Sequence, residues 1–200
     1  MEIQCECGKF RARLTNFPKN TPGRLRCYCD DCQAFMHYLK RGDLLDANGG
    51  TEIIPIYPRD IIFASENDLL KCTRMNPKGM YRFSTRCCNT PVANTDPKRP
   101  WVGTHRRMFT VKHPTQLDQT LGDIRASIMG KFARGTPPPG TPDKFDFKGF
   151  VTVMPFLLKG ALLGRKRPSP FFEHDLSIVT PYVLTEEERS SLLATARKAV

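Results

Sequence analysis

Hydrophobic and polar residues alternate in short runs over the first 113 residues, a pattern that is typical of β-strands. A hairpin is predicted over residues 1–14, with Cys5 and Cys7 on one face because side chains on a strand repeat every two residues. A short helix is expected over residues 33–39. Further strands are predicted at residues 53–57, 61–63, 69–73, 80–84, 101–104 and 108–111. The predicted fold class of this part is therefore mainly β.

The pattern changes after residue 113. Apolar residues recur at helical spacing over 117–132, and an apolar run over 150–163 predicts a second helix. That run is too short to span a bilayer, and a packed helix is favoured over one lying on an acidic membrane surface. The motif from Thr185 to Glu188 is a capping box that opens a final helix. Residues 1–113 are expected to form a β domain, and residues 114–200 a helical C-terminal extension packed on it, with a role in packing or in a homodimer.

The charge adds a question about partners, since 31 Lys and Arg residues against 20 Asp and Glu residues give a formal net charge of +11. A small anionic substrate, an acidic membrane surface and nucleic acid are all compatible with this charge. The basic residues are spread along the chain without a dense stripe, which disfavours nucleic acid. The sequence shows neither a signal peptide nor a transmembrane run, so a cytoplasmic location is expected. In a reducing compartment, clustered thiols more often bind metal than form disulfides.

Three cysteines in six residues form the densest chemical motif, Cys27, Cys29 and Cys32 in the spacing C-x-C-x-x-C. Three thiolates fill three corners of a zinc tetrahedron and leave one corner for a distant residue, water or substrate. His37 could close the fourth corner from the following helix, and the carboxylates of Asp30 and Asp31 are further candidates.

The remaining clustered cysteines suggest a second zinc site, since Cys5 and Cys7 form one pair and Cys87 and Cys88 another. Four thiolates from two chain segments make a closed tetrahedral site. Adjacent residues on a regular strand point to opposite faces, so the second pair needs a backbone turn. The last cysteine, Cys72, lies in an apolar strand and is expected in the core.

The order of these clusters resembles that of the glutathione-dependent formaldehyde-activating enzyme family, which includes the centromere protein V type. The resemblance covers residues 1–113. It implies a β-tent of small antiparallel sheets, one structural zinc on four cysteines, and a second zinc on the three central cysteines. It also implies carbon–sulfur lyase activity on a glutathione adduct at the second zinc.

Matched position by position, Cys5 and Cys7 correspond to the first structural pair, and the central motif corresponds to the family's catalytic triplet. The family's later motif, Phe-Cys-x-x-Cys-Gly-Thr, matches Cys87 at its second cysteine. Ser84 replaces the first cysteine and Cys88 stands where glycine is usual. A hydroxyl is a poor zinc ligand, so Cys88 is expected to take the vacant corner. The central motif also departs from the family at Asp30-Asp31, which indicates a divergent branch.

The expected function is therefore that of a zinc-dependent, carbon–sulfur lyase-like protein that binds or transforms a glutathione-type thiol adduct. The adduct's carboxylates would be held by Arg82, Arg86 or Arg106. Two alternatives stay open. One is a non-catalytic structural zinc module that binds a protein or nucleic acid, and the other is a redox protein in which the three central cysteines form disulfides.

Overall fold

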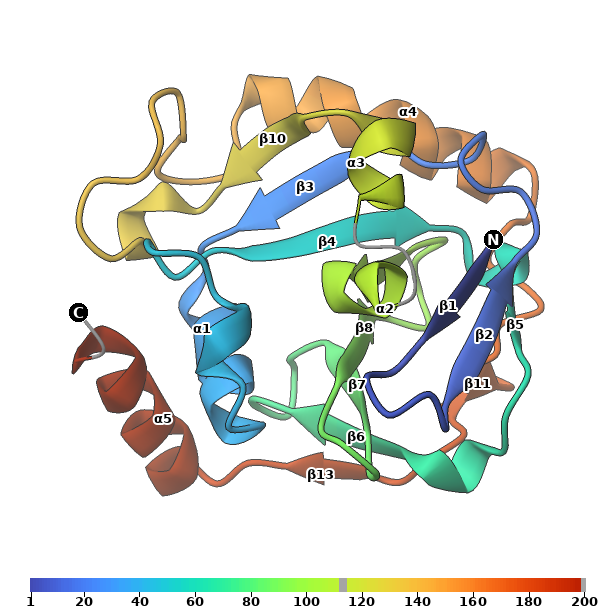
Figure 1. Ribbon diagram of the computed structural model, residues 1–200, viewed down its shortest axis with the longest axis horizontal. Helices are drawn as coiled ribbons and strands as arrows, with labels where there is room; N and C mark the ends of the chain where they lie inside the picture. The colour runs from blue at the N-terminus through green and yellow to red at the C-terminus, as the bar shows by residue number, and fades with distance from the viewer. Residues whose placement is uncertain (112–114, 199–200) are drawn as a thin grey trace.

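An eight-stranded mixed sheet organises the structure, a computed structural model that describes residues 1–111 and 115–198 (Figure 1). The strands are β1 (Glu2–Gln4), β2 (Arg11–Leu14), β3 (Arg24–Cys27), β4 (Thr51–Ile56), β5 (Ile61–Phe63), β6 (Leu70–Arg74), β7 (Tyr81–Thr85), β8 (Pro91–Thr95), β9 (Val102–His105), β10 (Ile124–Ile128), β11 (Phe172–Glu173), β12 (Leu176–Ser177) and β13 (Pro181–Val183). The helices are α1 (Asp30–Tyr38), α2 (Arg106–Thr110), α3 (Gln116–Leu121), α4 (Phe147–Leu162) and α5 (Glu186–Lys198). Single 3-10 turns lie at Gly42–Leu44, Pro58–Asp60, Asn67–Leu69 and Gly130–Phe132. Within this part of the chain the prediction of a mainly β fold is confirmed.

The large sheet has the order β10-β3-β4-β9-β8-β7-β6-β13. Its inner pairs are antiparallel, while β10 pairs parallel with β3 and β13 pairs parallel with β6. A second sheet has the order β1-β2-β5. Both edge strands of the large sheet, β10 and β13, therefore come from the C-terminal part of the chain. This part contributes strands to the sheet as well as helices. The domain boundary expected at residue 113 lies outside the described residues.

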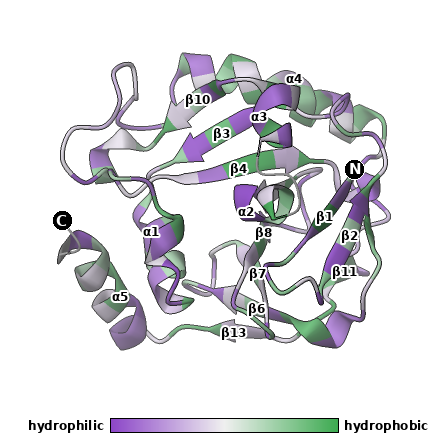
Figure 2. Cartoon of the chain, in the orientation of Figure 1, coloured by the Kyte–Doolittle hydropathy of each residue, from purple (hydrophilic) through white to green (hydrophobic). Residues whose placement is uncertain are grey.

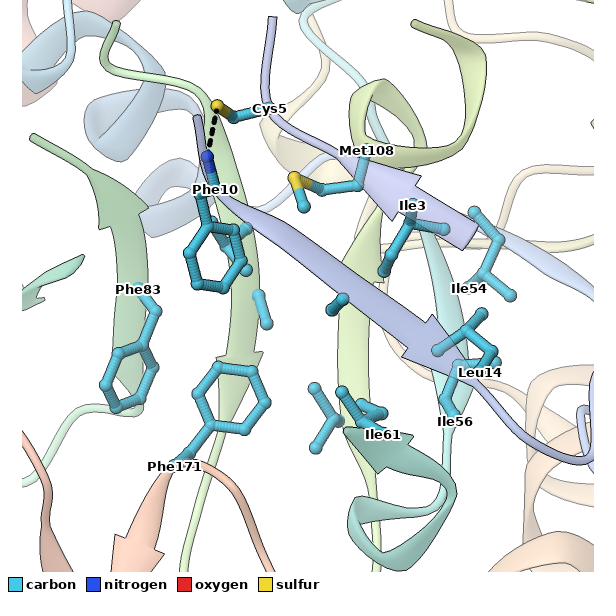
Figure 3. Packing of buried hydrophobic residues seen from close by; sticks show 14 of the residues in the cluster. Ile3, Cys5, Phe10, Leu14, Ile54, Ile56, Ile61, Phe83, Met108 and Phe171 are labelled. Atoms are coloured by element: carbon cyan, nitrogen blue, oxygen red, sulfur yellow. Dashed lines mark hydrogen bonds between the residues drawn. The ribbon is translucent and has the colours of Figure 1, made fainter. Parts of the chain in front are cut away.

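The main hydrophobic core lies between the two sheets and draws on both ends of the chain (Figure 3). Phe83 of β7 packs against Phe171, with ring centroids 4.7 Å apart. Phe171 also contacts Phe63 of β5, which in turn contacts Phe10 beside β2. Since Phe171 is buried at the centre of this chain of rings, the C-terminal part contributes directly to the core.

Two predicted elements are wrong. The helix expected over 117–132 ends at Leu121, where Gly122 takes a positive φ of 64°, and the chain then forms strand β10. The strand expected over 108–111 is instead helix α2, in which the neighbours Met108 and Phe109 are both buried. Short apolar runs fit either a strand or a helix by pattern alone. In the first case residues 124–128 form a strand because they pair with the edge of β3.

Other local predictions are confirmed. Helix α1 forms where a helix was predicted over residues 33–39, although it begins earlier, at Asp30, and so includes Cys32; α4 forms where the apolar run predicted a helix. The capping box at α5 is present, because the Thr185 backbone N–H donates to Glu188 at 2.8 Å and the Glu188 N–H donates to the Thr185 hydroxyl at 3.2 Å. Among the described residues, none of the helices has the length and apolar character needed to cross a membrane.

The contribution of the C-terminal part to the core is testable by replacing Phe171 with alanine. The side chain is 1% exposed, so its loss should lower the free energy of unfolding by about 3–5 kcal/mol, as for other buried phenylalanines. Phe147→Ala is the matched control, because Phe147 is 78% exposed and its loss should change stability by less than about 0.5 kcal/mol. Denaturant unfolding of both variants measures this. Equal stabilities would show that Phe171 is dispensable to the core.

Candidate metal centres

The first cysteine group joins the N-terminal hairpin to the β7–β8 turn. The sulfurs of Cys5, Cys7, Cys87 and Cys88 all lie within 4.8 Å of one another. The Cys5–Cys7, Cys5–Cys87, Cys7–Cys87 and Cys87–Cys88 sulfur pairs are 3.6, 3.8, 3.2 and 3.7 Å apart. Four sulfurs around a tetrahedral zinc at 2.3 Å would be about 3.8 Å apart. The group therefore has the donor set and nearly the spacing of a closed zinc–thiolate site.

Local turns explain why these four sulfurs converge. Cys5 and Cys7 lie in the tight connection after β1, where the Gly8 N–H donates to the Cys5 carbonyl at 2.9 Å. Cys87 and Cys88 lie in the turn between β7 and β8, where Asn89 takes a positive φ of 53°. Asparagine tolerates this conformation better than most residues. The turn that two adjacent cysteines need in order to face one point is therefore present.

Hydrogen bonds around the first group favour thiolate at Cys88. Although burial raises it, hydrogen bonds from the Thr85 and Thr90 hydroxyls, 3.3 and 3.1 Å from the sulfur, lower the pKa of Cys88 to about 6. At Cys5, burial raises the pKa to about 12, although the Phe10 backbone N–H donates to the sulfur at 3.3 Å (Figure 3). Metal binding has to deprotonate Cys5 as well, which couples binding to proton release.

Ser84, which stands where the resembled family has its first cysteine, and the remaining cysteine, Cys72, both lie outside the first group. Ser84 is fully buried on β7, and its hydroxyl has no hydrogen-bond partner within the described ranges. Cys72 is buried among apolar side chains of the main core, where burial raises its pKa to about 11. The structure thus brings Cys88, rather than Ser84 or Cys72, to the sulfur group.

The second cysteine group lies where β3 passes into α1. Cys27 is the last residue of β3, Cys29 caps α1, and Cys32 lies in the first helical turn. Their three sulfurs lie within 4.8 Å of one another. Cys27 and Cys32 are buried, whereas Cys29 is partly exposed. The start of a helix favours thiolate, because the backbone N–H groups there carry partial positive charge.

A buried arginine faces this group. Arg82 of β7 is 2% exposed, and its Nη1 lies 3.6 Å from the Cys32 sulfur. Burial disfavours the cation, but the negative charges of Cys32 and Cys29 raise the pKa of Arg82. Conversely, hydrogen bonds from Cys27 and Cys29, together with the charge of Arg82, lower the pKa of Cys32 well below its usual value. Arg82 is thus the counter-ion of the three-cysteine group and is not placed on the surface to hold a substrate.

The other residues considered as ligands for this group have different partners. His37 Nε2 lies 2.9 Å from a guanidinium nitrogen of Arg134. Asp31 forms an ion pair with Arg189 of α5 at 3.1 Å, and Asp30 accepts a hydrogen bond from the Asp31 backbone N–H. None of the three belongs to the sulfur group, as far as the described residues show. Asp31 instead helps to attach α5 to α1.

His105 is a functional candidate that sequence reasoning missed. It is 3% exposed at the end of β9, and neither ring nitrogen has a hydrogen-bond partner among the residues described. Burial lowers the pKa of His105 to about 4, and the charges of Cys32 and Arg82 also act on it. The ring lines a hollow of about 280 Å³. No spacing in the sequence marks this residue, because its neighbours come from other strands.

A second hollow, of about 350 Å³, borders the cysteine turn itself. Asp30 and Gln33, which directly follow Cys29 and Cys32, line it together with three cationic side chains from later segments, Lys131, Arg134 and Arg197. The other arginines considered for substrate binding are engaged elsewhere. Arg86 donates to the Leu70 carbonyl at 2.9 Å, and Arg106 forms an ion pair with Asp118 at 3.1 Å.

Comparison with known proteins gives a family match. A sequence model described as a family of unknown function (DUF6151) matches residues 1–180. No curated protein matches the chain. The crystal structure of a Rhodobacter sphaeroides protein is similar, with 15% sequence identity and a TM-score of 0.42 over 62% of this chain and 97% of that chain.

The burial of His105 predicts a specific pH dependence of stability. The histidine is neutral in the fold, with a pKa of about 4 against an ordinary value of 6.5, so the unfolded chain binds the extra proton between these values. Its contribution to stability is full above pH 6.5 and is lost as the pH falls towards 4. Between pH 7 and pH 5 the free energy of unfolding should therefore fall by about 2 kcal/mol more in the natural protein than in the His105→Asn variant. Denaturant unfolding at equal metal content measures the difference, and equal losses would contradict it.

Proposed function

The chain belongs to the family of unknown function DUF6151, and we propose that it is a zinc-dependent, carbon–sulfur lyase-like protein. In this proposal Cys27, Cys29 and Cys32 hold a zinc ion that binds a thiol adduct of the glutathione type. The first group, Cys5, Cys7, Cys87 and Cys88, holds a structural zinc, and the sheets form a β-tent around the two ions. The observation that supports the proposal most is the buried Arg82 beside three converging thiols.

Charge balance supports a metal at the second group. Without a metal, a single thiolate on Cys32 would neutralise Arg82, and the thiols of Cys27 and Cys29, whose pKa values are raised by their neighbouring thiols and by burial, would stay protonated. Three thiolates and Zn²⁺ carry a formal charge of −1, which the Arg82 cation also cancels. A buried charge is costly unless it is paired, so Arg82 would keep the loaded site neutral as a whole. An apolar residue at position 82 would leave the anionic site uncompensated.

The fourth corner is where the proposed chemistry would take place. Zinc bound by three thiolates would hold the sulfur of an adduct and stabilise it as a thiolate. Cys29 is the partly exposed member of the group, so a ligand would approach on its side. In the lyase direction the carbon–sulfur bond of an S-hydroxymethyl thioether breaks, and its electron pair stays on sulfur. The hydroxyl proton passes to water, and the products are a thiolate and an aldehyde.

The hollow beside the cysteine turn would bind the rest of the adduct. Lys131 and Arg197 lie on its rim, and their positive charges complement the two carboxylates of a glutathione-type ligand. Asp30, on the same rim, would pair with the ligand's ammonium group. The three cysteines do not line the hollow, but Asp30 does and directly follows Cys29, so the sulfur of a ligand there would have to extend past Asp30 to reach the metal.

The burial of Cys27 and Cys32 favours a second candidate, in which the site is closed and the protein is a non-catalytic zinc module. In that case both metal ions would only stabilise the folded structure, and the basic surface would bind a protein or nucleic acid. The two candidates differ in whether an external thiol can reach the second metal.

Metal analysis tests the two-site proposal. The full chain should bind two zinc ions, and Cys29→Ser should bind one, because a hydroxyl is a far poorer zinc ligand than a thiolate. Cys7→Ser should lose the other ion and also lower the thermal midpoint, since that site joins the N-terminus to the β7–β8 turn. Cys72→Ala is the control and should retain both ions. Two ions in Cys29→Ser would show that the central cysteines do not hold the second metal.

Cobalt substitution separates an open site from a closed one. With Co²⁺ in both sites, added glutathione should change the visible d–d absorption, because a new sulfur enters the fourth position of one metal. Glutathione added to the cobalt-loaded Cys29→Ser variant should leave its visible absorption spectrum unchanged. An unchanged spectrum of the natural protein at millimolar glutathione would favour the closed zinc module.

A further inference from the structure

Helix α4 presents an apolar stripe to solvent along its whole length. Phe147, Val151, Leu158 and Leu162 are 78%, 46%, 56% and 86% exposed. At 100° per residue these positions fall within about 60° of one another around the helix axis. Figure 1 shows α4 on the outside of the β10–β3 edge of the large sheet, and Figure 2 shows hydrophobic residues along most of its length. Large apolar side chains gathered on one exposed face mark an interaction surface.

The opposite side of α4 already holds the helix to the body. Phe156 stacks on Tyr57 with ring centroids 4.1 Å apart, and the Tyr57 hydroxyl donates to the Phe156 carbonyl at 2.7 Å. Gly160 is buried against the same ring, where a Cβ atom would lie 2.5 Å from a Tyr57 carbon. The exposed stripe is therefore not needed for packing within the chain.

Positive charge flanks the stripe. Lys148 and Lys159 lie eleven residues apart, hence on the same side of the helix next to the stripe, and Lys144 precedes it. All three are exposed, and none forms an ion pair with the part of the chain that the structure describes. The helix itself contains no Asp or Glu, while its N-cap Asp146 accepts a hydrogen bond from the Gly149 N–H.

We infer that α4 lies flat on an anionic lipid bilayer, with Phe147, Val151, Leu158 and Leu162 inserted among the acyl chains. Its 16 residues are fewer than the ~20 needed to span a bilayer, so an interfacial position is the one that buries the stripe. The flanking lysines would contact the lipid phosphates. The net charge of +11 adds attraction to an anionic surface and repulsion between copies of the chain. Antiparallel pairing of two α4 helices would also bring Lys148 of one copy near Lys159 of the other.

Vesicle co-sedimentation of the full chain tests this inference. The natural protein should bind vesicles of phosphatidylcholine with phosphatidylserine, and should bind phosphatidylcholine vesicles weakly. The double variant Leu158→Gln with Leu162→Gln should bind the anionic vesicles at least about tenfold more weakly, because two inserted side chains are lost. Leu176→Gln is the control, because Leu176 is 74% exposed on β12 and should leave binding unchanged. Circular dichroism and zinc content should be the same in all three proteins.

Three results would overturn the inference. The first is the absence of binding to anionic vesicles. The second is equal binding by the natural protein and the double variant, which would show attraction by surface charge alone. The third is a concentration-dependent dimer, seen by light scattering, that the double variant abolishes, since the stripe would then be covered by a second copy. None of these results depends on the metal chemistry proposed for the cysteines.

Discussion

The pairing of a buried arginine with clustered thiols constrains the whole structure. Arg82 is 2% exposed and its Nη1 lies 3.6 Å from the Cys32 sulfur; negative charge on Cys32 and Cys29 raises the pKa of Arg82 and opposes the cost of burying its cation. Strand β7 carries Arg82 on one face and Phe83, which packs in the main core, on the other. The same strand ends in the turn that holds Cys87 and Cys88. One strand therefore positions the counter-ion of the second cysteine group and two members of the first.

The C-terminal part of the chain completes this arrangement. Strands β10 and β13 close the two edges of the large sheet, and α5 packs against α1, which carries Cys32. The ion pair between Arg189 and Asp31 fixes that contact one residue before Cys32. Asp31 thus has a structural partner, so its presence in the cysteine motif does not place a negative charge at the fourth corner of the proposed zinc site. Any variant that loosens α5 should affect the cysteine turn as well.

Sequence reasoning located the cysteines because their spacing is local and chemically unusual. It also placed most strands, since alternation along a strand is visible in one dimension. It named Arg82 only as a residue that would hold a substrate carboxylate, and it missed His105. The positions of both residues follow from strand pairing between distant segments and from burial, neither of which leaves a spacing signal. The error over 117–132 has a similar cause, because residues 124–128 pair with β3 about a hundred positions earlier. Local pattern determines the element only where no distant sheet edge competes for it.

In the proposed site, Cys27, Cys29 and Cys32 would bind a metal beside Arg82 and leave its fourth position open. Crystals of the zinc-loaded protein, with anomalous data on both sides of the zinc absorption edge, test it most directly. Two anomalous peaks are expected. One should lie within about 2.3 Å of the four sulfurs of Cys5, Cys7, Cys87 and Cys88, and the other at that distance from three sulfurs and from a water or added thiol. A single peak at the first group, or a fourth protein ligand on the second metal, would contradict it.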